Sequence, residues 1–177
     1  MDLHEFKGGK MYFEESLSDV VKELLDGAAD AYGEGDAEKP LLKAFYLSPH
    51  SLTVLVALYR YYYYQHRYED ALAAADSSLR LASTRLGFPS DWREMNLTSL
   101  GYGVMESMTL VRFYLLALKG AGYLSLRLGQ IERGVEILEK VLELDSKDRL
   151  GVSVLLNTVE KYQRRKDANF GDLKLVV

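Results

Sequence analysis

The chain has 177 residues, a formal net charge of −4, 48% hydrophobic and 27% charged residues, and no cysteine. This length and composition predict one globular domain or one short solenoid, which buries roughly two-thirds of its unfolded surface. The acidic balance argues against non-specific binding of nucleic acid, which needs a basic surface. Without cysteine the chain has no disulfide, thiol catalysis or cysteine-based metal site.

Residues 1–14 are polar and acidic, so we expect a loose lead-in rather than a secretory signal. No apolar run approaches the roughly 18–20 residues that a membrane span needs. The most apolar stretch, residues 104–128, is interrupted by charged side chains. These observations predict a cytoplasmic protein that does not contact a membrane.

The first half of the chain predicts four helices joined by short turns. The first begins at Ser16 or Ser18, which are suitable N-caps, and ends near Tyr32. After a turn at residues 33–36, the second helix carries Pro40 in its first turn, where a missing N–H costs little. The second helix ends at Leu47, the third spans residues 50–64, and the fourth runs from Tyr68 to about Arg85.

Four consecutive tyrosines, Tyr61 to Tyr64, end the third predicted helix. Consecutive residues surround a helix, so these four side chains cannot all be core. Some face the interior, and the others are either half-exposed, with solvated hydroxyl groups, or line a ligand groove. Both arrangements can hold at once.

Residues 86–114 interrupt the helical pattern. A short helix is predicted at Trp92, and Gly101 and Gly103 flank a bend. From Val104 the pattern is helical through Leu128, and a helix of about 25 residues would overhang its partner by two or three turns. The side chains expected to cover the overhang are Trp92, Met95 and Leu97, or those of a second chain.

The chain is predicted to end with two further helices and a tail. The first of these helices spans residues 131–144. The second, residues 149–166, has one apolar and one polar face and closes the domain as a cap. Residues 167–177 are expected to form a tail.

An internal repeat underlies these helices. Ala37 and Ala71 are 34 residues apart, and Gly134 takes the same place in a third copy, residues 115–148. A helix–turn–helix unit of 34 residues is the tetratricopeptide period. The residues that carry the resemblance are Leu118, Ala121, Gly122, Gly134, Leu138 and Val141 in the third copy, Leu55, Leu58, Tyr62, Ala71 and Ala75 in the second, and Val21, Leu24, Ala37, Leu41, Ala44 and Pro49 in the first.

The chain therefore resembles a tetratricopeptide-repeat (TPR) protein over roughly residues 18–166. The resemblance implies an all-α, TPR-like solenoid of antiparallel helix pairs with a C-terminal capping helix. Leu25 and Tyr59 stand where the family prefers small residues, so these helix pairs must accommodate more volume or splay. The domain is expected at 15–166, with repeats near 18–51, 52–85 and 115–148, an insert at 86–114 and the cap at 149–166.

The resemblance also implies a function, because first helices of TPR pairs line a concave groove that holds peptides. An adaptor or chaperone-like protein without catalytic activity is expected. Asp26 and Ala57 stand at positions where carboxylate-clamp TPR domains use asparagine, so no such clamp is expected. Carried over position by position, the peptide-binding groove consists of Arg60, Tyr63, Tyr64, Lys119, Tyr123, Arg127, Asp26 and Asp30.

Chemistry of other kinds has little support in the sequence. The three histidines lack metal-ligand spacing and the glycines form no phosphate loop, so we expect no catalytic residue, metal or cofactor. Two alternatives to the groove remain. One is a small-molecule cavity between the tyrosine-rich helix and the insert. The other is a homodimer formed through Trp92, Met95, Met105 and Met108.

Overall fold

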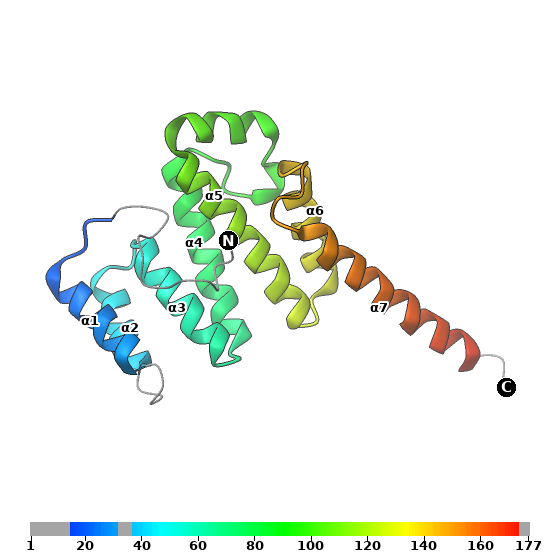
Figure 1. Cartoon of the computed structure of the whole chain (residues 1–177), viewed down its shortest axis with the longest axis horizontal. Helices are drawn as coiled ribbons and strands as arrows, with labels where there is room; N and C mark the ends of the chain where they lie inside the picture. Colours follow the sequence, from blue (N-terminus) through cyan, green and yellow to red (C-terminus); the bar gives the residue numbers. More distant parts are fainter. Residues whose placement is uncertain (1–14, 32–36, 174–177) are drawn as a thin grey trace.

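The computed structural model describes residues 15–31 and 37–173, with side chains as far as residue 165. Within these ranges the chain is all-α, as expected, and its helices follow one another across the molecule in chain order (Figure 1). Each helix packs chiefly against the helices before and after it. The helices are α1 (Asp19–Asp30), α2 (Glu38–Leu47), α3 (Leu52–Tyr64), α4 (Tyr68–Leu86), α5 (Leu97–Arg127), α6 (Ile131–Leu144) and α7 (Val152–Leu173), with a short 3₁₀ helix, η2 (Trp92–Glu94), before α5.

The helix starts follow from local capping. Ser18 caps α1 because its side chain accepts from the Val21 N–H over 3.4 Å, and Ser51 caps α3 by accepting from the Val54 N–H over 3.2 Å. Pro40 lies in the first turn of α2, as predicted. The expected lead-in at residues 1–14 and the turn at 33–36 lie outside the described residues.

Glu15 adds a second cap to α3 from far away in the sequence. Its carboxylate accepts hydrogen bonds from the N–H groups of Leu52 (3.0 Å) and Thr53 (2.9 Å) and from the Ser51 hydroxyl (2.7 Å). Arg85, near the end of α4, pairs with it over 2.7 Å. Burial alone would raise the pKa of Glu15, but these hydrogen bonds outweigh burial and hold the pKa below its usual value.

The α3–α4 and α5–α6 turns have the same hydrogen-bond pattern. In the first, the Arg67 N–H donates to the Tyr62 carbonyl, and in the second the Gln130 N–H donates to the Ser125 carbonyl, each over 2.9 Å. This bond closes a Schellman motif, which requires a left-handed residue after the helix. The pattern repeats after 63 residues, the same offset that separates Ala71 from Gly134. The left-handed residues are His66, with φ of 58°, and Gly129, with φ of 76°.

The turns that leave α2 and α6 also match. The Ser48 N–H donates to the Ala44 carbonyl over 2.9 Å, and the Asp145 N–H donates to the Val141 carbonyl over 2.8 Å. The offset here is 97 residues, which is one 34-residue repeat plus the 63-residue step. The small residues at the starts of the second helices, Ala37, Ala71 and Gly134, are all buried.

The predicted continuous helix from Val104 to Leu128 is wrong, because Ser107 interrupts α5 with φ of −160° and ψ of 99°. The Ser107 side chain then caps the next stretch by accepting from the Leu110 N–H over 3.2 Å. The residues before this kink, 97–106, form a separate helical arm, here called the transverse segment. It is the green helix that lies across the top of the molecule in Figure 1.

The bend expected at Gly101 and Gly103 is also wrong, since both residues lie inside a helix. Gly103 is buried against Phe88, and a Cβ there would come within 2.4 Å of the ring. This glycine therefore allows a close approach between the transverse segment and the residues that follow α4, and has no role in bending the chain.

The last helix is longer than predicted. It was expected at residues 149–166, but α7 spans Val152–Leu173, so residues 167–173 of the expected tail are helical. Val152 is buried, whereas Val154 and Tyr162 are 65% and 64% exposed. Figure 1 accordingly shows α7 leaving the body of the molecule after its first turns.

Candidate interaction site

Three helices bring aromatic side chains together near the α3–α4 turn. The group consists of Tyr63 and Tyr64 from α3, Tyr68 from α4, and Tyr123 and Arg127 from α5, and is called here the tyrosine–arginine cluster. Ring centroids lie 5.7 Å apart for Tyr63 and Tyr64, 6.1 Å for Tyr63 and Tyr68, and 6.3 Å for Tyr63 and Tyr123. These distances are typical of favourable aromatic pairs. Tyr63 is therefore the centre of the cluster.

Arg127 is oriented by neutral partners. Its Nη1 donates to the Tyr123 hydroxyl over 3.0 Å and its Nη2 to the Tyr68 hydroxyl over 2.8 Å. The guanidinium also lies 4.6 Å from the centre of the Tyr68 ring, within cation–π range. Among the described residues no carboxylate pairs with Arg127, and its side chain is exposed. The site therefore presents a positive charge that is held in place but not neutralised.

The hydroxyl group of Tyr63 stays protonated near neutral pH. Burial raises the pKa of Tyr63 to about 12, and a hydrogen bond with Tyr123 contributes in the same direction. The Tyr68 oxygen lies 2.9 Å from His66 Nδ1 as well as close to Arg127. The cluster thus presents hydroxyl groups, aromatic rings and one cation.

The sequence predicted part of this site. Tyr63, Tyr64, Tyr123 and Arg127 lie together, and Tyr64 is 46% exposed. Tyr68 was missed because the resemblance directs attention to first helices, whereas Tyr68 is the first residue of a second helix. The four tyrosines divide between interior and surface as expected, since Tyr61 and Tyr62 are buried, Tyr63 is half-buried and Tyr64 is exposed.

Other predicted groove residues lie elsewhere. Lys119 donates to the Leu150 carbonyl over 2.8 Å and so holds the turn before α7. Arg60 is half-buried on α3. Asp26 and Asp30 are exposed on α1, which packs chiefly against α2 rather than against the helices of the cluster. The acidic end of the predicted groove is therefore not part of the same group of side chains.

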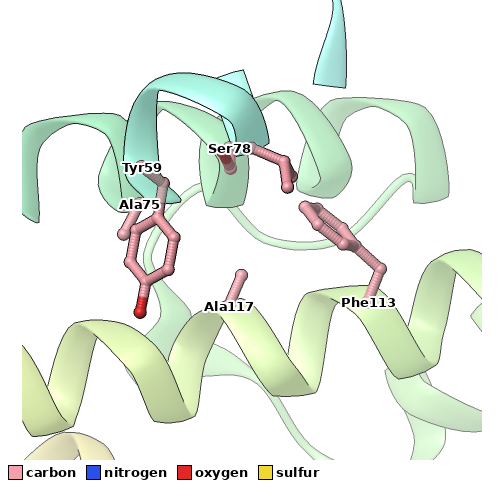
Figure 2. A pocket seen from close by; sticks show the side chains of 6 residues that line it. Tyr59, Ala75, Ser78, Phe113 and Ala117 are labelled. Carbon is pink, nitrogen blue, oxygen red and sulfur yellow. The ribbon is translucent and has the colours of Figure 1, made fainter. Parts of the chain in front are cut away.

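The cavity expected between the tyrosine-rich helix and the insert is only a void of about 10 Å³ among α3, α4 and α5. Figure 2 shows Tyr59 and Phe113 on opposite sides of it, with Ser78 and Ala117 between them and Ala75 on the side of Tyr59. A space of this size holds at most one water molecule, and its lining is apolar. It is a packing defect rather than a ligand site.

The residues expected to form a homodimer differ in how far they are exposed. Met95 is 1% exposed and belongs to the core, so its prediction as an interface residue is wrong. Trp92 is half-buried, with the Arg93 guanidinium 4.3 Å from its ring. Met105 and Met108 are 83% and 53% exposed.

The described residues contain no cluster of three histidine, aspartate or glutamate side chains arranged to hold a metal. Within the same part of the chain, no helix combines the length and the apolar character that crossing a bilayer requires.

Comparison with known proteins gives one informative match. No family model matches the chain, and no solved structure matches it. A protein of Azotobacter chroococcum mcd 1 is 48% identical over 162 residues, which cover 92% of this chain and 90% of that protein. It is described as an uncharacterized 19.8 kDa protein in the nifW 5′ region.

Proposed function

The chain belongs to the same family as the uncharacterized 19.8 kDa protein of Azotobacter chroococcum, and we propose that it is a non-catalytic interaction module. In this proposal a TPR-like solenoid binds an extended segment of a partner protein at the tyrosine–arginine cluster. The observation that carries the proposal is Arg127, an exposed cation held by two tyrosine hydroxyl groups and by no carboxylate among the described residues.

The TPR-like arrangement is supported by repetition in the backbone. Turns at equivalent places have the same hydrogen bonds, and the offsets between them agree with the offsets in the sequence. The helices pack sequentially, as repeats that contact only their neighbours do. In such an array a binding surface is built from several helices at once, and the cluster draws on three.

The chemistry of the cluster indicates what it binds. Arginine and tyrosine are the residue types that contribute most to protein interfaces. Arg127 has no carboxylate partner among the described residues, so the bound segment supplies an acidic side chain, and the exposed ring of Tyr64, which packs against Tyr63, offers an aromatic face. The hydroxyl groups of Tyr123 and Tyr68 fix Arg127 in advance, which reduces the entropy lost on binding.

The test is capture of a defined partner by the purified, tagged chain. The relative is named for its position in the nifW 5′ region, so the nifW product is the first candidate partner to test. If it does not bind, an extract of the cells that produce the protein supplies further candidate partners. A captured protein is then purified and its affinity measured by calorimetry. We expect the variants Tyr64→Ala/Tyr123→Ala and Arg127→Gln each to weaken binding at least about tenfold.

The matched control is Tyr46→Ala, which removes an 85% exposed tyrosine of α2 that lies outside the cluster. It is expected to bind like the wild type. Circular dichroism establishes that every variant is folded. Equal binding by folded wild-type and cluster variants would exclude this site.

Self-association is a second candidate function, favoured by one observation. The transverse segment and the kink after it expose apolar side chains on one arm of the molecule: Leu97 (60%), Tyr102 (69%), Met105 (83%) and Met108 (53%). Such groups of exposed apolar residues are typical of interfaces. Light scattering of the wild type and of Met105→Glu/Met108→Glu tests this, and a wild type that stays monomeric at high concentration excludes it.

A further inference from the structure

The last helix has an outer face without a neighbour in the described chain. The side chains of residues 160–165 are all exposed, where α7 extends past the body of the molecule (Figure 1). Val154 and Tyr162 are 65% and 64% exposed, and Lys161 and Arg165 lie on the same side of the helix. The four residues follow one another at spacings of seven, one and three, which places them on one face. This face, here called the basic end, is both apolar and positively charged.

The first helix has a similar outer face at the opposite end of the molecule (Figure 1). Val20, Glu23, Gly27 and Asp30 are exposed and follow one another at spacings of three, four and three along α1. Val20 is 57% exposed, and a Cβ on Gly27 would meet no described residue beyond its own helix within 4 Å. This face, here called the acidic end, is apolar and negatively charged.

The charges of the two ends are not neutralised within the described chain. Lys22 of α1 pairs with Asp19 over 3.1 Å, and Arg164 of α7 pairs with Glu160 over 3.0 Å. The charged residues of the acidic end and of the basic end take no part in these ion pairs and have no oppositely charged partner among the described residues. Each end can therefore attract a surface of opposite sign.

The signs of the charges indicate what covers the two ends. Two basic ends in contact would place lysine and arginine against like charges, and two acidic ends would place carboxylates together, which costs binding energy. A basic end and an acidic end attract each other. We propose that the chain associates end to end with a second copy of itself, the basic end of α7 lying against the acidic end of α1. The contact is heterologous, because different surfaces of the two copies meet.

The spacing of the two faces fits a parallel alignment of the helices. With Tyr162 placed over the glycine of the acidic end, which leaves room for the ring, Arg165 is level with Asp30. Val154 then comes within one residue of Val20. An antiparallel alignment with the same ring position would place Val154 beyond the end of α1. The parallel contact therefore joins apolar to apolar residues and a cation to a carboxylate.

Such a junction is weak and sensitive to salt, because exposed ion pairs contribute little and are screened. We expect the full-length protein to associate at roughly 10–100 μM, and this association to weaken at least about tenfold between about 0.05 and about 0.5 M NaCl. Sedimentation velocity over a series of protein concentrations measures both effects.

Charge reversal at one end tests the junction. The variants are Glu23→Lys/Asp30→Lys at the acidic end and Lys161→Glu/Arg165→Glu at the basic end. Each variant alone has like charges at both ends and should associate at least about tenfold more weakly than the wild type. In an equimolar mixture, a junction between the two variants joins opposite charges again, so association should recover. A folding defect in either variant could not produce this recovery.

Three control variants should associate as the wild type does. Glu69→Lys/Glu94→Lys has the same change in net charge as the acidic-end variant, at exposed carboxylates outside both ends. Met105→Glu/Met108→Glu changes the transverse segment, and Arg127→Gln changes the tyrosine–arginine cluster. Loss of association in either of the last two would place the contact at those surfaces instead.

A wild type that stays monomeric at high concentration excludes end-to-end association. A charge-reversed variant that associates like the wild type, or a mixture that stays monomeric, excludes it as well. Capture of the protein partner at the tyrosine–arginine cluster is measured separately and should be unchanged by charge reversal at either end. The two proposals can therefore fail independently.

Discussion

The α3–α4 and α5–α6 hairpins carry the large and the small residue of an equivalent pair on opposite helices. In the second hairpin, Gly122 of the first helix faces Leu138 of the next, and a Cβ on Gly122 would lie 2.9 Å from Leu138 Cδ2. The residues 63 positions earlier are Tyr59 and Ala75, so the large side chain is now on the first helix. Tyr59 and Ala75 line the same void, and Figure 2 shows the Tyr59 hydroxyl directed toward α5.

This exchange shows that a large side chain on one helix is paired with a small one on the other, whichever helix carries the large residue. Interiors pack at nearly constant density, so a large side chain requires a small one opposite it. Tyr59 is 4% exposed, which means that the helix pair absorbs it within the core. The departure from the repeat pattern at Tyr59 is thus compensated at Ala75, two turns into the following helix.

The largest expected loss of stability comes from placing the tyrosine of the α3–α4 hairpin at the equivalent position of the α5–α6 hairpin, without changing the residue opposite it. Gly122→Tyr places a ring where Leu138 and Ile137 already lie within about 3 Å of a Cβ, so we expect a loss of at least about 3 kcal/mol in the free energy of unfolding. Urea denaturation followed by circular dichroism measures the loss.

The rescue is Gly122→Tyr/Leu138→Ala, which reproduces the Tyr59–Ala75 pair. Leu138→Ala alone should cost about 2–5 kcal/mol, yet the double variant should be more stable than Gly122→Tyr alone. Additive losses would show that the two hairpins are not interchangeable in this way.

A second prediction removes the large residue from the first hairpin. Tyr59→Ala leaves a cavity that adds to the existing void of about 10 Å³, and should cost about 3–5 kcal/mol by analogy with other aromatic truncations. Tyr59→Ala/Ala75→Leu moves the volume to α4, as in the α5–α6 hairpin, and should recover part of the loss. Chemical denaturation compares the two variants, and no recovery would count against the exchange of volumes.

The hairpins also differ in how their first helices are anchored. Glu15 caps α3 from outside the hairpin, whereas the Ser107 side chain caps the continuing part of α5 locally. Glu15→Gln should cost about 1–3 kcal/mol at pH 7, because it removes a partly buried carboxylate that accepts several hydrogen bonds.

The pH dependence of this anchor has a definite sign. The pKa of Glu15 is lowered from 4.5 by folding, so its contribution is present above pH 4.5 and is lost as the pH falls through the lower folded pKa. The difference in unfolding free energy between wild type and Glu15→Gln should therefore shrink below about pH 4.5. A constant difference from pH 7 to pH 3 would mean that the carboxylate charge is not responsible.

How far the sequence could predict this molecule depended on the range of the interactions. Periodicity and local caps predicted the helix ends at Leu47, Tyr64 and Leu144, because these depend on neighbours in the chain. The kink at Ser107 was missed because the glycines were taken as the breakers, whereas Gly103 lies inside a helix, packed against Phe88, a tertiary contact that the sequence does not show.

The candidate site also has a part that the sequence could predict and a part that depends on tertiary packing. Helix register alone places Tyr123 and Arg127 four residues apart on one face. The hydrogen bond between Arg127 and Tyr68 depends on how α4 packs against α5. The hydrogen bond from Lys119 to the Leu150 carbonyl depends on the turn before α7. No local pattern in the sequence contains that information.

The smallest expected effect concerns the one residue by which the two turns differ most. His66 has φ of 58° where the second turn has Gly129 with φ of 76°. A left-handed conformation costs a non-glycine residue roughly 1 kcal/mol, so His66→Gly relieves strain but also loses the 2.9 Å contact with Tyr68. We expect a net gain of at most about 0.5 kcal/mol, whereas Gly129→Ala should lose about 1 kcal/mol. Thermal melts of the two variants measure both changes, and His66→Ala, which loses the contact but keeps the strain, separates the two contributions. If His66→Gly is less stable than His66→Ala, backbone strain does not distinguish the turns.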